Sequence, residues 1–164
     1  MTATIFCQTP LGTMLLECDD VALTLARFVD HAESREPGAS ASGHPLLGRA
    51  GAALRRYFEC GEIDASLPLA PAGTSFQREV WSRIARVACG ETTSYLAIAR
   101  ALGSPSSVRA VGAATGRNPL CIFIPCHRIV ASGGALTGYA WGIERKRALL
   151  AMEHDFARRR RRAA

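Results

Sequence analysis

The spacing of apolar residues changes near residue 45, and this change constrains the fold more than any other feature of the sequence. Residues 3–8 and 12–18 alternate apolar with small or polar side chains on either side of the turn-forming stretch TPLG, and residues 21–29 follow an Asp-Asp turn. Because alternation with period two is typical of strands with one buried face, these segments predict a small antiparallel sheet. Residues 31–43 are predicted to be a loop.

Beyond residue 45 the apolar residues recur at helical spacing. The first predicted helix has an apolar face made of Leu46, Leu47, Ala50, Leu54 and Phe58. A proline-rich connector, IDASLPLAPAG, follows it. In the second half, Thr74 is a candidate cap for a helix that ends before Gly90. The last predicted helix, in IERKRALLAMEHDF, has these residues on its inward face: Ile143, Leu149, Leu150 and Met152.

Two short helices in the stretch SYLAIARALGSPSSVRAVGAATG are joined by a turn for which Ser104 or Ser106 is the predicted cap. Such a pair is typical of a helix-turn-helix, although many small helical domains contain one. The second helix carries small side chains where base-reading polar residues would be expected, and its one long polar residue is Arg109. These residues alone leave two interpretations open, a DNA-binding helix and a small-residue face packed on another helix.

These elements predict an α/β fold of the α+β kind. Residues 1–70 are expected to form an N-terminal α/β domain, a small antiparallel sheet with a helix. Residues 71–156 are expected to form a mainly helical domain that contains the helix-turn-helix and the stretch PCHR. Residues 157–164 are expected to be a disordered basic tail, because Arg158–Arg162 are five consecutive arginines.

The net charge of +6 comes mostly from that tail, since the remaining chain has 20 − 5 = 15 cations against 14 acids. Nucleic-acid affinity would therefore have to come from a local patch. No apolar run is long enough for a transmembrane helix, and the N-terminus lacks the pattern of a signal peptide, so a cytoplasmic protein is expected. The six cysteines form no CxxC pair, and most are expected to be small buried hydrophobes.

The stretch FIPCHRIVASGG places a thiol, a base and a permanent cation side by side, at Cys126, His127 and Arg128. The apolar run Leu120–Ile124 before it predicts a buried strand. A thiol attacks as thiolate, and a neighbouring base or cation favours that form. Adjacent side chains on a strand point to opposite faces, so a turn or a bridging water would be needed. A buried structural cysteine and a zinc ligand are the other interpretations, but zinc lacks a second ligand pair.

The stretch NPLCIFIPCHRIV, with SYLAIARALGSPSSVRAVGAATGR before it and GGALTGYAWGIERKRALLAME after it, resembles the O6-alkylguanine-DNA alkyltransferase family over residues 74–153. The resemblance implies an enzyme that acts once: a methylated-DNA–[protein]-cysteine S-methyltransferase that repairs O6-alkylguanine, and O4-alkylthymine as well, without a cofactor. Its implied partner is double-stranded DNA carrying the lesion, with no membrane and no obligate protein partner, and a monomeric state. The alternatives are a non-catalytic lesion-binding protein and a DNA-binding regulator.

The resemblance also implies catalytic roles. Cys126 accepts the alkyl group, His127 takes the thiol proton through a water, and Glu153 orients that histidine. Tyr95 donates to the guanine ring as it leaves, and Asn118 is a hinge between the recognition helix and the active-site segment.

Further roles follow from the same resemblance. Arg109 fills the gap left by the flipped nucleotide, while the small residues Ala110 and Gly112 let the helix enter the minor groove. The other expected DNA contacts are Ser104, Ser132 and Arg128. The expected lining of the guanine pocket comprises Tyr139, Ala140, Trp141, Lys146 and Ile129. Some members of the family bind zinc in the N-terminal half, but the spacing of Cys7, Cys18 and His31 does not match, so no metal is predicted.

Overall fold

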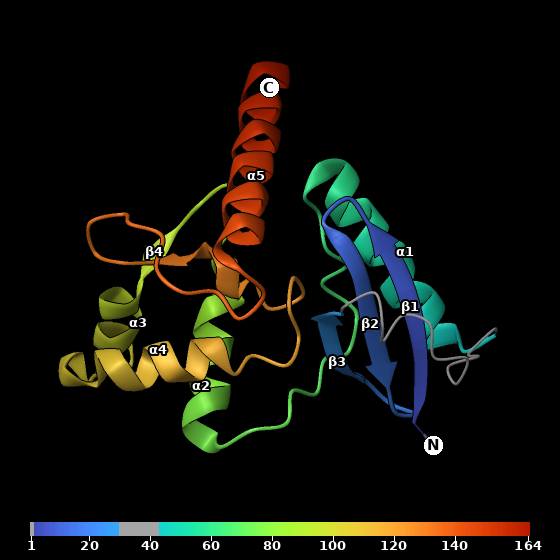
Figure 1. Cartoon of the computed structure of the whole chain (residues 1–164), viewed down its shortest axis with the longest axis horizontal. Helices are drawn as coiled ribbons and strands as arrows, with labels where there is room; N and C mark the ends of the chain where they lie inside the picture. The colour runs from blue at the N-terminus through green and yellow to red at the C-terminus, as the bar shows by residue number, and fades with distance from the viewer. Residues whose placement is uncertain (1, 30–42) are drawn as a thin grey trace. The chain divides into compact units, whose positions relative to one another are not determined.

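The computed structural model of the chain describes residues 2–29 and 43–164 (Figure 1). It has two compact units: one comprises Met1–Ala72 and Pro119–Phe123, the other Gly73–Asn118 and Ile124–Ala164. The first boundary lies close to the one expected near residue 70, whereas the return of Pro119–Phe123 to the first unit was not foreseen. The predicted loop over residues 31–43, which includes His31, lies outside the described residues except for Gly43.

The first unit contains a three-stranded antiparallel sheet in the order β1-β2-β3, which confirms the predicted sheet (Figure 1). Its strands are β1 (Ala3–Thr9), β2 (Gly12–Cys18) and β3 (Leu23–Phe28). On β2 the side chains of Met14, Leu16 and Cys18 are buried. They share one face because successive residues of a strand point to opposite sides of the sheet.

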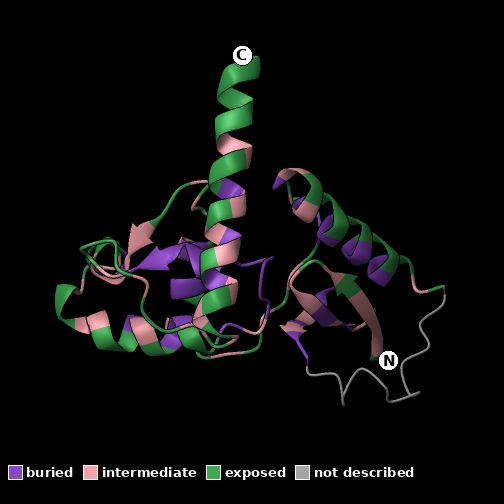
Figure 2. Ribbon diagram, turned by 45° about the horizontal axis from the view of Figure 1, so that its top comes forward, coloured by how far each residue is buried: buried purple, intermediate pink, exposed green. Residues whose placement is uncertain are grey.

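Helix α1 (Pro45–Cys60) packs against β1 and β2, and the colouring of Figure 2 shows its buried residues along one side of the ribbon. Leu47, Ala50 and Leu54 are buried as the spacing predicted, while Phe58 is only half-buried. The helix ends at Gly61, whose φ of 77° is easily adopted by glycine.

The apolar segment Leu120–Ile124 is buried throughout, as expected, but it is not a strand. It makes only an isolated bridge to β3: Ala26 N–H donates to Pro119 O, and Cys121 N–H donates to Ala26 O, both at 2.8 Å. The chain then turns at Ile122, whose φ is 73°. This left-handed conformation is costly for a β-branched residue and interrupts any extended strand, so the strand prediction was wrong.

The second unit is mainly helical around a two-stranded parallel sheet, β4 (Thr93–Ser94) and β5 (Ile129–Val130). Helix α2 (Ser75–Ile84) begins at the predicted cap. Thr74 Oγ1 accepts from Gln77 N–H at 3.2 Å and the Gln77 side chain accepts from Thr74 N–H at 2.9 Å, a capping box. The indole N–H of Trp81 donates to Ala114 O at 2.8 Å, which fixes α2 on helix α4 (Val108–Gly116).

Helices α3 (Tyr95–Ala101) and α4 (Val108–Gly116) pack together, as Figure 1 shows, with the 3-10 turn η2 (Pro105–Ser107) between them. The N-cap of α4 is Ser107, not Ser104 or Ser106, because η2 runs directly into the helix. Ser104 Oγ lies 2.6 Å from Ser107 Oγ and so closes this turn.

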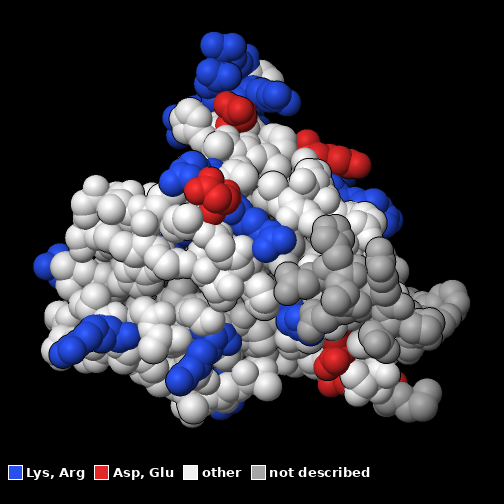
Figure 3. Space-filling model, in the orientation of Figure 1, with Lys and Arg blue, Asp and Glu red and all other residues white. Residues whose placement is uncertain are grey.

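Helix α5 (Ile143–Ala163) includes Arg158–Arg162, so the tail expected to be disordered is helical. These arginines are exposed, and Figure 3 shows basic side chains gathered around the C-terminal end of α5. Of the four residues predicted to face inward, Leu149 alone is buried. The other two buried positions of α5 are charged, Lys146 and Glu153.

No helix among residues 2–29 and 43–164, α5 included, is both long and apolar enough to cross a membrane. All six cysteines lie among these described residues, and none of them forms a disulfide.

Two glycine substitutions test how closely Gly90 packs against α5. A Cβ at Gly90, where φ is 85°, would lie 2.5 Å from Ala157 Cβ, whereas a Cβ at Gly48, in α1, would meet nothing within 4 Å. Gly90→Ala should lower the free energy of unfolding by about 2 kcal/mol or more, through backbone strain and overpacking. Gly48→Ala should raise it by about 0.5–1 kcal/mol, because alanine loses less backbone entropy. Urea denaturation measures both, and equal effects would contradict the packing at Gly90.

Candidate active site

Cys126 begins a 3-10 turn, η3 (Cys126–Arg128), rather than continuing a strand. Pro125 precedes it, and the turn is closed by a 2.9 Å hydrogen bond from Arg128 N–H to Pro125 O. Because the chain turns here, the side chains of Cys126, His127 and Arg128 do not alternate between two faces of a sheet. Cys126 keeps 6% of its surface exposed, whereas His127 is fully buried behind it.

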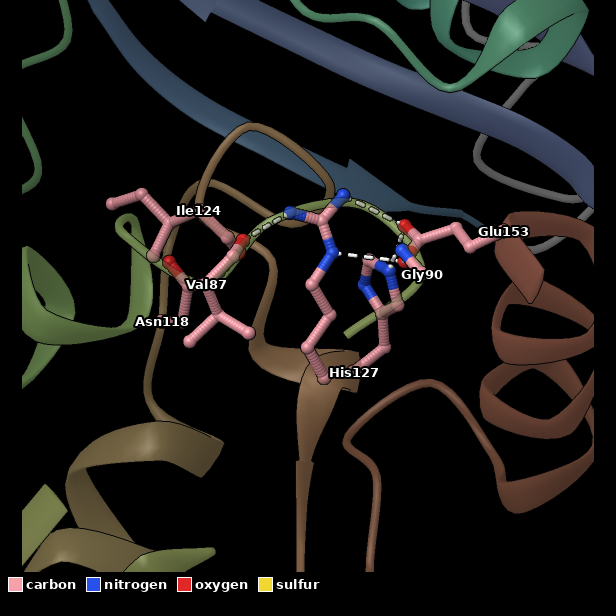
Figure 4. A network of polar contacts seen from close by, with 7 residues as sticks. Val87, Gly90, Asn118, Ile124, His127 and Glu153 are labelled. Carbon is pink, nitrogen blue, oxygen red and sulfur yellow. Dashed lines mark hydrogen bonds and ion pairs between the residues drawn. The ribbon is translucent and has the colours of Figure 1, made fainter. Parts of the chain in front are cut away.

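The buried imidazole of His127 is held by a carboxylate from α5. His127 Nε2 lies 2.7 Å from Glu153 Oε1, and Gly90 N–H donates to Glu153 Oε2 at 3.3 Å; Figure 4 shows this group. Glu153 is also fully buried. A histidine fixed by a carboxylate on one ring nitrogen offers its other nitrogen to a reacting group. Local folding alone cannot produce this pair, since 26 residues separate its members.

The charges of this network favour an ionised Glu153 beside a neutral His127. Burial raises the pKa of Glu153, but hydrogen bonds from His127 and Arg128 outweigh it and hold that pKa well below its usual range. Burial lowers the pKa of His127; Glu153 opposes this shift, while Arg128 and Lys146 add to it. Because an ionised carboxylate only accepts hydrogen bonds, Nε2 must carry the proton and Nδ1 is the acceptor.

A pocket of about 260 Å³ opens in front of Cys126. It lies just below the range of roughly 300–1,000 Å³ that suits drug-sized ligands, so it fits a single small ring system. Its lining residues come from α3, α4, the segment after α4, η3 and the loop before α5: Tyr95, Gly112, Thr115, Gly116, Asn118, Cys126, Gly138, Tyr139, Ala140 and Trp141. The structure thus brings together seven of the residues singled out from the sequence.

Three lining residues were missed, namely Thr115, Gly116 and Gly138. Gly138 adjoins Tyr139 and Gly116 lies two residues before Asn118, so their small size next to predicted site residues was an available signal. Thr115 had no such signal, because its hydroxyl donates to Val111 O within α4.

Asn118 and Lys146 hold the backbone around the pocket. Asn118 Nδ2 donates to Ile124 O at 2.7 Å and so ties the end of α4 to the residues before Cys126. Lys146 does not line the pocket but lies fully buried, with its ammonium donating to Ile129 O at 2.6 Å and to Thr137 O at 2.9 Å. Burial lowers the pKa of Lys146, and the nearby Cys126 opposes that shift.

The exposed residues of α4 include Arg109, Ala110 and Ala113, so a face of small side chains begins with one long cation. On the opposite face Val111, Ala114 and Thr115 are buried. This arrangement allows another surface to approach α4 closely.

Four predicted site residues lie elsewhere. Ile129 is fully buried and touches the site through its carbonyl oxygen, so its assignment to the pocket lining was wrong. Ser132 is exposed on the loop after β5, and Ser104 lies in the turn before α4. Arg128 keeps only 7% of its surface exposed, and its guanidinium is engaged by Glu153. Burial and this ion pair leave Arg128 unsuited to a DNA contact.

A metal centre has no support in the part of the chain that the structure describes, where no three His, Cys, Asp or Glu side chains cluster. Cys7 lies on β1, Cys18 on β2, and His31 is outside the described residues. Cys18 Sγ instead lies 3.5 Å from His44 Nδ1.

Comparison with known proteins places this site in a family. The model for the DNA-binding domain of 6-O-methylguanine DNA methyltransferase matches residues 75–155. A methylated-DNA–protein-cysteine methyltransferase of Methanosarcina acetivorans is 38% identical over 148 residues, which cover 89% of this chain and 94% of the relative. One of Mycolicibacterium paratuberculosis is 42% identical over 150 residues, 89% of this chain and 88% of the relative.

Solved structures agree. The crystal structure of the O6-methylguanine methyltransferase of Mycobacterium tuberculosis covers 94% of both chains, with a TM-score of 0.79 and 35% identity. The OGT protein of the same organism in complex with DNA matches 94% of this chain and 93% of its own, with a TM-score of 0.78 and 38% identity. This chain belongs to the methylated-DNA–protein-cysteine methyltransferase family, which confirms the resemblance and the α+β fold inferred from the sequence.

The buried His127 predicts how stability depends on pH. Its pKa is lower in the folded chain than the ordinary value of about 6.5, so below that pH the unfolded chain binds a proton that the folded chain does not. The free energy of unfolding should therefore fall as pH drops from about 6.5 towards 5, with a slope approaching about 1.4 kcal/mol per pH unit. Urea denaturation at several pH values measures the slope.

The matched control is His154, an exposed histidine of α5. His154→Gln should leave the slope unchanged, and His127→Gln should reduce it. A His127→Gln variant that keeps the full slope would show that another group is responsible.

Proposed function

We propose that the chain repairs O6-alkylguanine, and by the same chemistry O4-alkylthymine, in double-stranded DNA by transferring the alkyl group to Cys126. The observation that carries this proposal is the placement of Cys126 in the lining of a base-sized pocket, with the buried His127–Glu153 pair next to it in the chain fold. A protein that only senses lesions or regulates genes does not need a nucleophile with its own base and orienting carboxylate.

In the proposed reaction, the thiol proton of Cys126 passes through a bridging water to Nδ1 of His127, whose Nε2–H remains bonded to Glu153. The thiolate attacks the alkyl carbon: the carbon–sulfur bond forms while the carbon–O6 bond breaks. Negative charge then develops on the base, and the hydroxyl of Tyr95, which lines the pocket, donates to it. Such a donor lowers the barrier because it is already in place when the charge forms.

The position of Cys126 requires the base to leave the DNA duplex, since the alkylated atom of a stacked guanine cannot reach a buried thiol. We infer that α3 and α4 act as a helix-turn-helix whose second helix lies in the minor groove. The small exposed side chains Ala110 and Ala113 permit this approach, and Arg109 fills the space left by the flipped nucleotide. Ser104 and Ser132 are proposed backbone contacts, and Tyr139, Ala140 and Trp141 enclose the base.

Asn118 acts as the proposed hinge, and Lys146 supports the loop that encloses the base from behind. The thiol nucleophile fits a reducing compartment, so we place the protein in the cytoplasm. It acts as a monomer with no cofactor, no metal and no obligate protein partner.

The stoichiometry of repair tests the mechanism. A thioether on Cys126 has no leaving group that water can displace at neutral pH, so each molecule should react once. A plot of repaired lesions against protein should plateau at one lesion per molecule, with the mass of one alkyl group added at Cys126. Cys126→Ser should abolish transfer and keep DNA affinity within about two-fold, because the thiol makes no backbone contact. Repair well above one lesion per molecule would require a different mechanism.

Arg109→Ala tests base flipping. The arginine is proposed to offset the cost of unstacking, a few kcal/mol, which a free base does not incur. Transfer from O6-methylguanine in duplex DNA should slow by about ten-fold or more, while reaction with a free O6-alkylguanine base should stay near the wild-type rate. Arg117→Ala, an exposed arginine just after α4, serves as the control. Equal losses on both substrates would rule out the role of Arg109.

A further inference from the structure

Arg128 is joined to the carboxylate that orients His127. Its Nε donates to Glu153 Oε2 at 2.9 Å and its Nη2 donates to Glu153 Oε1 at 2.8 Å. The third donor, Nη1, reaches Val87 O at 2.6 Å. Two parallel bonds between a planar guanidinium and a carboxylate fix both orientation and distance, which a single ion pair does not.

The two hydrogen bonds from the Arg128 guanidinium fix the orientation of the Glu153 carboxylate. Oε1 receives bonds from both Arg128 and His127, and Oε2 receives them from Arg128 and the backbone of Gly90. A carboxylate held by donors on both oxygens cannot rotate away from His127. Three of the four bonds come from N–H donors of Arg128 and Gly90, and such bonds favour the ionised form of Glu153.

The charge of Arg128 matters as well as its shape. The ionisable groups that face or adjoin His127 are Glu153 and Lys146 from α5 and Cys126 and Arg128 from η3. Burial is the main reason why the pKa of His127 is low; Glu153 opposes that shift, while the charge of Arg128 reinforces it. With the arginine in place, the pair carries one proton, on Nε2 of His127.

We propose that Arg128 is a positioning residue for alkyl transfer: it holds Glu153 ionised and oriented, so that His127 keeps its proton on Nε2 and presents Nδ1 as the base. This inference rests on the proposed function, because it assigns the role of a residue within that site. It replaces the DNA contact expected for Arg128 from the sequence.

Removal of the arginine has a defined consequence. In Arg128→Met the pair would bind a second proton at higher pH, because the cation bonded to Glu153 is gone and only Lys146 still opposes that proton. If the proton is on His127, the imidazole is no longer a base. If it is on Glu153, the acid donates to Nε2 and leaves the ring proton on Nδ1, which again blocks the base. With the proton at either location, the acid limb of the pH–rate profile moves to higher pH.

The experiment measures single-turnover transfer from O6-methylguanine duplex DNA between pH 6 and 9, with each rate normalised to the fraction of protein that reacts. Arg128→Met should shift the acid limb of the pH–rate profile to higher pH by about one unit. Transfer at pH 6.5 should then be about ten-fold slower than in the wild type, and recover as pH rises towards 9. Arg128→Lys keeps the positive charge but loses the paired hydrogen bonds to Glu153. It should therefore lower the rate at every pH, with little shift of the acid limb of the pH–rate profile.

The control is Arg147→Met, which removes an exposed arginine of α5 that pairs with Glu144 at the surface and should leave the profile unchanged. An unshifted limb in a normally reacting Arg128→Met would overturn the inference. If that variant does not fold, ¹⁵N shifts of the His127 ring in the wild-type protein decide: a proton on Nε2 supports the role, and one on Nδ1 refutes it. A wild-type protein that transfers no alkyl group would instead refute the proposed function.

Discussion

The active site depends on one buried anion. Glu153 connects α5 to η3 through His127 and Arg128, and to the turn after α2 through Gly90. A buried carboxylate is tolerable only when its charge is compensated and its oxygens accept hydrogen bonds, so these three segments must come together for the unit to fold. Removing one partner leaves an uncompensated charge, and such losses typically cost about 3–5 kcal/mol. Stability and nucleophile activation thus rest on the same contacts.

Local patterns predicted much of the fold. Period-two alternation located β1 and β2, and the Asp-Asp turn located the start of the segment that contains β3. Helical spacing located α1, and the residue type of Thr74 located the cap of α2. Such patterns are reliable where the position of a residue within its own strand or helix decides whether that residue is buried. They failed where burial depends on distant partners: Leu120–Ile124 is apolar enough for a strand, yet the positive φ of Ile122 turns the chain away from β3.

The site shows the same limit more sharply. The sequence alone drew attention to Cys126 and His127 because they are adjacent, but only the family resemblance pointed to Glu153, 26 residues away from its partner. Lys146 was expected to line the pocket and Arg128 to contact DNA, yet both are buried. Their burial follows from acceptors supplied by other segments: carbonyl oxygens of Ile129 and Thr137 for the lysine, and the carboxylate of Glu153 for the arginine.

The chain passes between its two units three times, after Ala72, after Asn118 and after Phe123. The hydrogen bonds of Ala26 with Pro119 and Cys121 therefore join segments that lie far apart in the gene. A recombination event with one crossover between them would separate β3 from the segment it pairs with. Neither unit is one uninterrupted stretch of the gene, so the exchange of a whole unit between related genes would need two separate segments.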